Sequence, residues 1–229
     1  MLIVESIKNG GLNMERRRIL CFGDSLTWGF DPVTKTRLGE DIRWTGVLQN
    51  KLGDGYRVVE EGQNGRTIAT EDPTEGEKNG LKYLEPCLES QKPLDLMIIM
   101  LGTNDMKLKF NYCAMDIAGE MQRFLEKVQS YNRFRFENKM KVLLIAPPVL
   151  GGTGYGTWLD VCFDFKRTPA ISTELRDYYK MLAGMYDCAF LDASEFVVPS
   201  EADGTHLDAE NQVKLGEAIY KKIIEDGLC

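Results

Sequence analysis

Five apolar runs, separated by longer amphipathic stretches, constrain the fold of this chain more than any other feature. The runs lie at residues 17–25, 56–62, 94–105, 141–150 and 188–196. They are apolar throughout rather than alternating with polar residues, as strands of a parallel sheet covered on both faces require. The regular alternation of such runs with amphipathic stretches predicts an α/β fold, in which helices cover both faces of a five-stranded parallel sheet.

The amphipathic stretches predict the helices of this fold. They lie at residues 43–53, 81–90, 114–129, 172–187 and 208–225. The fourth stretch begins at Ser172, a residue type that commonly caps a helix N-terminus. A chain of 229 residues fits one domain. We expect this domain to cover residues 16–229, with residues 1–15 a flexible extension and Met14 a candidate native start.

Composition narrows the classes of partner and the cellular compartment. The chain carries 28 Lys and Arg against 35 Asp and Glu, a net charge of −7. This balance argues against nucleic acid or an anionic membrane as the main partner, because phosphate binding needs a basic surface. The opening residues lack the apolar core of a signal peptide, and no segment approaches the length of a membrane span. Six scattered cysteines without a C-x-x-C pair indicate a reducing compartment, and we expect a cytoplasmic protein.

Polar residues follow the first three predicted strands, where they are expected to share one edge of the sheet. Ser25 ends the run ILCFGDS, Gly65 lies in EGQNGRT, and Asn104 lies in LGTND. Taken singly, Ser25 could cap a helix, Gly65 could serve only a turn, and Asn104 could form an Asx turn. Together, the Ser25 and Gly65 N–H groups and the Asn104 side chain could form an oxyanion hole. The neighbouring Asp105 is interpreted as a helix cap.

The last predicted turn carries the only histidine of the chain. His206 follows Asp203 by three residues, just before the terminal helix. This spacing lets the carboxylate reach one ring nitrogen and orient the ring, while the other nitrogen faces a serine as general base. A zinc site is not expected, because one histidine and dispersed cysteines do not make a ligand set. No cofactor is expected either, since no glycine-rich phosphate loop is present.

These residues resemble the motifs of the SGNH, or GDSL, hydrolase family. The four blocks are FGDSLTWG, GQNGRT, LGTND and DGTHL, which occur in the family's order between residues 22 and 207. The resemblance implies a flavodoxin-like three-layer α/β/α sandwich. It implies Ser25 as nucleophile, His206 as base and Asp203 as the orienting acid. It also implies an oxyanion hole formed by Ser25, Gly65 and Asn104, in agreement with the reasoning from residue types.

Within this family, the segments SLTWG, RWTGVLQNKLG and LGTNDMK look like the arylesterase and acyltransferase branch. That branch acts on small acyl groups and often forms oligomers, so we expect a homo-oligomeric esterase with a small-molecule ester substrate. Trp28 either lines the acyl pocket or packs against the sheet. Tyr155 and Trp158, in the irregular segment 147–169, either cover the site or bury a subunit contact.

Three other functions remain as alternatives. Members of this family also deacetylate carbohydrates, and the sequence does not separate that activity from action on simple esters. A metal-dependent phosphoesterase would need clustered carboxylates, whereas Asp24, Asp105 and Asp203 have local explanations. An inactive binding module is the least favoured reading, because the serine, the histidine and the oxyanion donors are all present.

Overall fold

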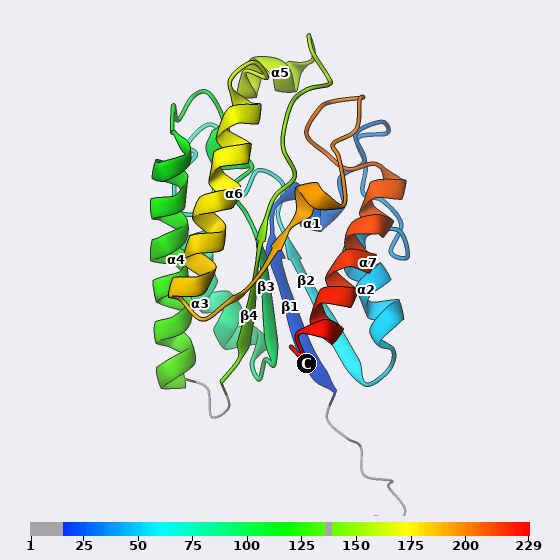
Figure 1. Cartoon of the computed structure of the whole chain (residues 1–229), viewed down its shortest axis with the longest axis vertical. Coiled ribbons are helices and arrows are strands. Elements are labelled where there is room, and N and C mark those ends of the chain that lie inside the picture. Colours follow the sequence, from blue (N-terminus) through cyan, green and yellow to red (C-terminus); the bar gives the residue numbers. More distant parts are fainter. Residues whose placement is uncertain (1–15, 136–138) are drawn as a thin grey trace, which may run out of the picture.

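The computed structural model describes residues 16–135 and 139–229 (Figure 1). Its five strands are β1 (Arg17–Gly23), β2 (Tyr56–Gly62), β3 (Leu96–Met100), β4 (Lys141–Ala146) and β5 (Ala189–Asp192). They form one sheet in the order β2-β1-β3-β4-β5, and all neighbours are parallel. This is the strand order of flavodoxin-like folds. The α/β sandwich predicted from the sequence is therefore confirmed, whereas the predicted extension at residues 1–15 lies outside the described residues.

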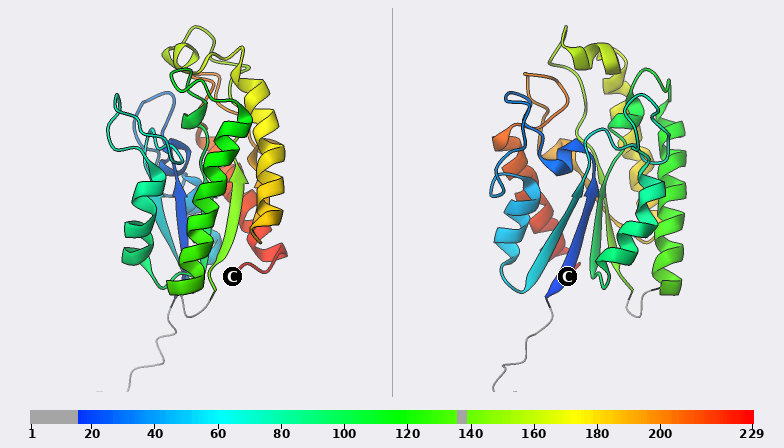
Figure 2. Two further views of the ribbon diagram at one scale, coloured as in Figure 1. Left: turned by 90° about the vertical axis from the view of Figure 1, so that its left-hand side faces the viewer. Right: turned by 180° about the vertical axis from the view of Figure 1, so that it is seen from behind.

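Helices cover both faces of the sheet and complete the three layers (Figure 2). The longer ones are α2 (Trp44–Leu52), α3 (Gly80–Gln91), α4 (Ala114–Arg135), α6 (Thr168–Met185) and α7 (Ala209–Glu225). Helices α2 and α7 pack on one face, and α3, α4 and α6 pack on the other (Figure 1). Two short helices, α1 (Ser25–Trp28) and α5 (Trp158–Phe163), lie near the upper edge of the sheet in this view.

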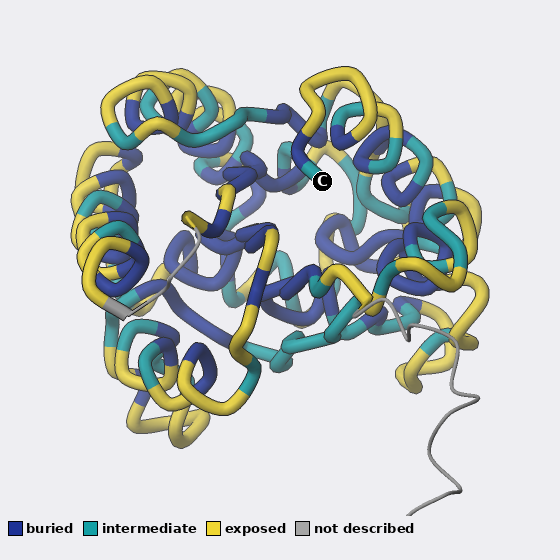
Figure 3. The backbone as a smooth tube through the Cα atoms, turned by 90° about the horizontal axis from the view of Figure 1, so that it is seen from below, coloured by how far each residue is buried: buried dark blue, intermediate teal, exposed yellow. Residues whose placement is uncertain are grey.

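The uninterrupted apolar character of the central strands has a direct structural cause. All five residues of β3 are buried, and its side chains alternate between the two faces. Met97 and Ile99 join the core beneath α3, α4 and α6. Leu96, Ile98 and Met100 join the core beneath α2 and α7. Figure 3 shows the consequence for the helices, which are buried where they face the sheet and exposed on their outer sides.

All strands except β2 end earlier than the apolar runs suggest, and the first three strands end at the same level. Gly23 of β1 pairs in register with Gly62 of β2 and with Met100 of β3. A Cβ on Gly23 would lie 2.1 Å from Thr27 Oγ1 and 2.8 Å from the Met100 carbonyl oxygen, so only glycine fits. The residues that follow these three strands therefore emerge side by side at one edge of the sheet.

Two expectations about the segment before α6 are corrected by the structure. Helix α6 begins at Thr168 and carries a proline in its first turn, so Ser172 lies inside the helix and does not cap it. Ser172 is buried, and its hydroxyl accepts a hydrogen bond of 3.2 Å from the Leu150 N–H. The segment 147–169 is also not irregular throughout, because Thr157 caps α5 within it.

Among residues 16–135 and 139–229, none of the helices combines the length and the apolar character that crossing a bilayer requires.

Candidate active site

Ser25 lies at the first turn after β1, at the start of α1. Asp24 caps this helix, because its Oδ1 accepts a hydrogen bond of 2.9 Å from the Leu26 N–H. Ser25 is the first helical residue, so its own N–H has no partner within the helix and is available to an anion. Gly29 ends the helix with φ +82°, a conformation that glycine adopts without strain. The short helix thus presents both the hydroxyl and the N–H of Ser25 at the edge of the sheet.

The structure brings Ser25, His206 and Asp203 together in a hydrogen-bonded chain. His206 Nε2 lies 2.9 Å from Ser25 Oγ, and His206 Nδ1 lies 2.7 Å from Asp203 Oδ2. All three side chains are buried. If Nδ1 carries the proton, it donates to the Asp203 carboxylate and Nε2 accepts from the Ser25 hydroxyl. This arrangement can remove a proton from Ser25 and stabilise the imidazolium that forms.

Asp203 is held as a carboxylate by its own turn. Burial alone would raise its pKa, but hydrogen bonds from the His206 ring and from the His206 and Thr205 N–H groups outweigh burial and lower the pKa below its usual value. Asp203 Oδ1 accepts these two backbone bonds at 2.9 and 3.0 Å. The three-residue spacing of Asp203 and His206 makes this possible, because one carboxylate reaches both the backbone and the ring.

The loop after β4 supports this turn from outside. The Gly151 N–H donates to the Gly204 carbonyl oxygen at 2.9 Å. A Cβ at Gly154, where φ is +69°, would lie 2.5 Å from the Asp203 carbonyl carbon and from the Gly204 nitrogen. The two backbones therefore touch at Gly154, and the segment 147–169 helps to fix the position of Asp203.

Gly65 and Asn104 line the same cavity as Ser25. Gly65 has φ +81° and lines the cavity described below. The Asn104 amide nitrogen donates to the Arg66 carbonyl oxygen at 3.1 Å, and Asn104 is buried. An amide nitrogen carries two hydrogens, so this bond fixes the plane of the Asn104 amide and leaves the second hydrogen for another acceptor.

The sequence interpretation of Asp105 as a helix cap is wrong. Asp105 lies within a short 3₁₀ turn, Asn104–Met106, and is fully buried. Its Oδ1 accepts a hydrogen bond of 2.9 Å from the Ile68 N–H. Burial and the neighbouring Glu120 carboxylate raise the pKa of Asp105 well above its usual value. The side chain therefore ties the loop after β3 to the loop after β2, which carries Gly65.

Asp24 is a second buried carboxyl group close to the histidine. Burial raises its pKa to about 6, although the Leu26 N–H, His206, Thr103 and Arg66 all act to lower it. The cap of α1 therefore changes its protonation near neutral pH, close to Ser25.

A cavity of about 630 Å³ opens beside Ser25 and His206. Its apolar part includes Phe30, Trp158, Leu159 and Phe163, and its polar part includes Thr74, Glu75, Lys107 and Lys109. Trp158 lines the cavity and is largely exposed, in keeping with one of its two predicted positions. Trp28 and Tyr155 are not among the lining residues of the described chain. Trp28 lies beneath the Arg37 guanidinium, and Tyr155 packs edge-on against Phe165, so the structure gives their substrate-binding role no support.

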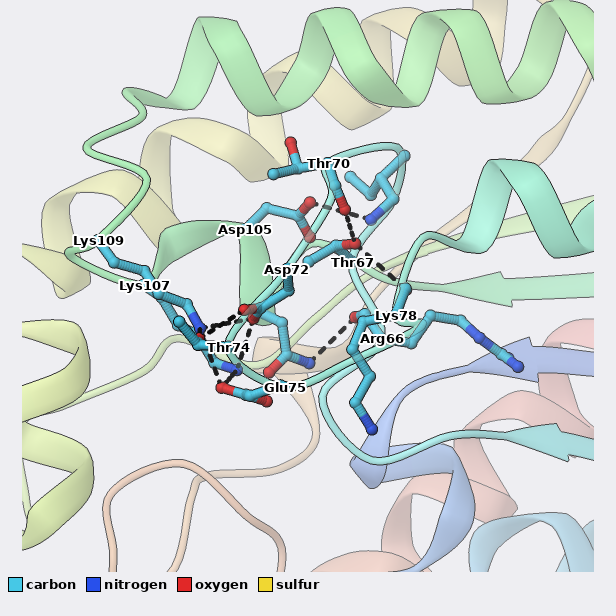
Figure 4. Close-up of polar contacts among 12 residues, drawn as sticks. Arg66, Thr67, Thr70, Asp72, Thr74, Glu75, Lys78, Asp105, Lys107 and Lys109 are labelled. Atoms are coloured by element: carbon cyan, nitrogen blue, oxygen red, sulfur yellow. Dashed lines mark hydrogen bonds and ion pairs between the residues drawn. The ribbon is translucent and has the colours of Figure 1, made fainter.

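Sequence reasoning missed two groups of residues at this cavity. The Phe30 ring lies against the His206 ring, with centroids 4.4 Å apart. Its place five residues after Ser25 is the only sequence signal that could have identified it. The second group is polar: Lys107 and Lys109 each form ion pairs with Glu75 and with Asp72 (Figure 4). Lys107 and Lys109 follow Asn104 closely, but Asp72 and Glu75 have no recognisable motif.

The fold and these side chains define an α/β protein with a serine, histidine and aspartate site at the carboxyl edge of its sheet. The chain belongs to the GDSL-like lipase/acylhydrolase family, whose model matches residues 21–222. None of the curated protein sequences is significantly similar to the chain. The family resemblance derived from the four sequence blocks is thereby confirmed.

Solved structures of esterases are similar to this chain over most of its length. The native aryl esterase of M. smegmatis has 38% identity and a TM-score of 0.84, and the match covers 91% of this chain and 99% of that one. A carbohydrate acetylesterase from Sinorhizobium meliloti has 38% identity and a TM-score of 0.85, covering 92% and 99%. A second carbohydrate acetylesterase family member from that organism has 32% identity and a TM-score of 0.84, covering 93% and 99%. Family and neighbours together identify the chain as a carboxylic ester hydrolase and argue against an inactive binding module.

Proposed function

We propose that this protein is a serine esterase that hydrolyses small, acetyl-type esters through a Ser25–His206–Asp203 triad and an acyl-enzyme intermediate. The observation that carries the proposal is the hydrogen-bonded chain from Ser25 Oγ through His206 to Asp203, at 2.9 and 2.7 Å, beside an open cavity. The preference for small acyl groups is supported by the aryl esterase and the carbohydrate acetylesterases among the similar structures.

The reaction follows from this geometry in two half-reactions. His206 Nε2 takes the proton of the Ser25 hydroxyl as Oγ attacks the ester carbonyl carbon, and a tetrahedral intermediate forms. His206 then gives this proton to the leaving alcohol oxygen as the bond from carbon to that oxygen breaks. Water, or a second alcohol, enters by the same steps and releases the acyl group from Ser25. Asp203 stays ionised throughout and holds Nδ1–H, so that Nε2 keeps its lone pair towards Ser25.

The negative oxygen of the intermediate needs donors that are already in place. We assign this role to the Ser25 N–H, the Gly65 N–H and the Asn104 amide, which lie around one part of the cavity. Backbone donors and an amide fixed by the Arg66 carbonyl need no reorganisation during the reaction, which is the source of most oxyanion stabilisation.

A second candidate activity, deacetylation of carbohydrates, is favoured by the polar part of the cavity. Thr74, Glu75 and Lys109 offer donors and acceptors that could meet sugar hydroxyl groups. The buried Thr205 hydroxyl also lines the cavity and has no hydrogen-bond partner within the described part of the chain. The exposed ring of Trp158 at the same cavity offers a flat apolar surface for a sugar ring.

The two activities are separated by one set of assays. The purified protein and its Ser25→Ala variant are compared on 4-nitrophenyl acetate, butyrate and octanoate, and on acetylated xylo-oligosaccharides. We expect hydrolysis that declines with acyl length and is lost in the variant. A higher kcat/KM on the acetylated sugar than on the aryl acetate would favour the carbohydrate activity. Unchanged hydrolysis in the Ser25→Ala variant would contradict both.

We further propose that the protein forms a homo-oligomer and that it is located in the cytoplasm. A homo-oligomer is supported by the family resemblance and by exposed apolar side chains near the cavity, such as Trp158 and Val161. A cytoplasmic location is supported by six scattered cysteines, all unpaired. Light scattering coupled to gel filtration measures the oligomeric state, and cell fractionation measures the cellular location.

A further inference from the structure

We propose that the ion pair between Lys107 and Glu75 sets both the geometry and the local charge of the oxyanion hole, with Lys107 acting as a positioning residue. This inference rests on the proposed function. It concerns two residues that come from different loops, Glu75 from the loop after β2 and Lys107 from the loop after β3, and that lie 32 positions apart in the sequence.

Lys107 is coupled directly to one of the assigned donors. Its N–H donates to the Asn104 carbonyl oxygen at 3.2 Å and closes the 3₁₀ turn that holds Asn104. Its side chain is only 8% exposed, and Nζ lies 2.6 Å from Glu75 Oε1 and 3.9 Å from Asp72 Oδ2. Two carboxylates therefore face this nearly buried side chain and compensate for its removal from water. Lys107 therefore connects the Glu75 carboxylate, through its side chain, with the turn that carries Asn104, through its backbone.

Glu75 is coupled in the same way to the second donor. A Cβ at Gly65 would lie 2.6 Å from Glu75 Oε2, so the carboxylate packs directly on the Cα of Gly65. One ion pair thus connects the segment of Gly65 with the segment of Asn104, and Figure 4 shows it among the neighbouring polar contacts.

The ion pair of Lys107 and Glu75 also affects the electrostatic environment of the oxyanion hole. Glu75 lines the same cavity as Ser25, where negative charge develops on the substrate oxygen. A carboxylate in this cavity without a partner would oppose that charge, because charges in a partly desolvated site are weakly screened. Lys107 at 2.6 Å and Lys109 at 3.1 Å both offset the Glu75 charge, and Lys107 is the closer and the more buried of the two. Burial acts to raise the pKa of Glu75, but Lys107 and Lys109 outweigh burial and lower it, and Lys107 has the larger effect of the two.

Other contacts hold the two loops together, which makes the proposal testable without loss of the fold. Asn104 bonds to the Arg66 carbonyl and Asp105 to the Ile68 N–H. Lys109 pairs with Asp72 at 2.5 Å and also with Glu75 at 3.1 Å. Removing the charge of Lys107 should therefore leave the fold of both loops intact. Glu75 would keep only the more exposed Lys109 as a partner, so its position against Gly65 and its charge compensation would change.

The experiment is a double-mutant cycle on 4-nitrophenyl acetate, with Lys107→Met, Glu75→Gln and the double variant in the full chain. We expect Lys107→Met to lower kcat about 10- to 100-fold, less than the loss of a donor itself, with KM changed less than about threefold. In the Glu75→Gln background the same change should cost less than about threefold, because the carboxylate that Lys107 positions and offsets is then absent. Lys82→Met is the matched control, since Lys82 pairs at 2.8 Å with Glu71 in an exposed position, and it should leave kcat unchanged.

The outcomes separate the inference from the function on which it rests. Wild-type kcat in Lys107→Met, or an equal loss in both backgrounds, would overturn the inference while leaving the esterase assignment intact. An equal loss of kcat in Lys82→Met would also overturn the inference, because removing any lysine charge near this loop would then have the same effect as removing that of Lys107. If the wild-type protein shows no hydrolysis that depends on Ser25, the proposed function fails and the inference falls with it.

Discussion

His206 Nε2 lies 2.9 Å from Ser25 Oγ, although 181 positions of the chain separate the two residues. Ser25 is placed by the end of β1, and His206 by the turn that leads into α7 (Figure 1). The contact is buried, although both residues also line the cavity. A serine hydroxyl and an imidazole fixed in this way, with a carboxylate behind the ring, form the arrangement that activates a serine nucleophile.

Asp203→Asn should lower kcat about 10⁴-fold on any ester that the protein hydrolyses. An asparagine amide at this position would donate to Nδ1, so the proton would move to Nε2 and the ring could no longer accept from Ser25. The turn itself should survive, because the asparagine oxygen can still accept the Thr205 and His206 N–H groups. Steady-state kinetics with a thermal unfolding control measures this. A loss below about tenfold in a folded variant would show that Asp203 does not orient the histidine.

Asn104→Ala should lower kcat about 10²- to 10³-fold with little change in KM, because the oxyanion exists only in the transition state and the intermediate. Asn50→Ala, which removes an exposed hydrogen bond to Asp41, is the control and should have no effect. An increase in KM at constant kcat would instead place Asn104 in substrate binding.

Gly154→Ala should reduce both stability and activity more than Gly152→Ala. Both glycines have positive φ, so each alanine introduces a similar backbone strain of about 1 kcal/mol. Only at Gly154 does the new Cβ meet the Asp203 backbone, whereas nothing lies within 4 Å at Gly152. We expect kcat to fall at least about tenfold in Gly154→Ala alone. Urea unfolding and steady-state kinetics compare the stability and kcat of the two variants. Equal stability and equal kcat would show that the loop does not position Asp203.

Asp24 should make the stability of the protein depend on pH between about pH 4 and pH 7. Its pKa in the folded protein is about 6, above its ordinary value of 3.8. The folded state therefore holds this proton more tightly, so the contribution of Asp24 is full below the ordinary pKa and is lost as the pH rises through 6. The difference in unfolding free energy between the wild type and Asp24→Asn should shift by about 3 kcal/mol over this range.

Denaturant unfolding of the two proteins at several pH values measures this difference, in which the titration of other groups cancels. Asparagine keeps the oxygen that accepts the Leu26 N–H, so the cap of α1 is retained. A difference that does not change with pH would show that Asp24 titrates at an ordinary value.

The sheet could be predicted because burial on both faces leaves its mark on the sequence. The central strands β3 and β4 contain almost only apolar residues. The polar residues that follow β1, β2 and β3 fall at one edge because these strands end in register. The position of Ser25, Gly65 and Asn104 at this edge follows from the same rule. Asp203 and His206 were identifiable because their contact is local.

Features that depend on contacts between distant segments could not be predicted. Asp105 resembles a cap by its position, but its partner is the Ile68 N–H in another loop. Ser172 also resembles a cap, yet Thr168 and Pro169 begin the helix before it. The ion pair of Glu75 and Lys107 has no local pattern, since ordinary charged residues of two loops meet only after the sheet has formed.

Reaction with diisopropyl fluorophosphate, followed by mass spectrometry of the peptides, tests the central claim most directly, because this reagent phosphorylates a serine that a neighbouring base activates. We predict one adduct, on the peptide that contains Ser25, with no adduct in Ser25→Ala and far slower labelling in His206→Ala. A folded wild-type protein that hydrolyses esters but carries no adduct on Ser25, or carries it equally fast without His206, would contradict the triad.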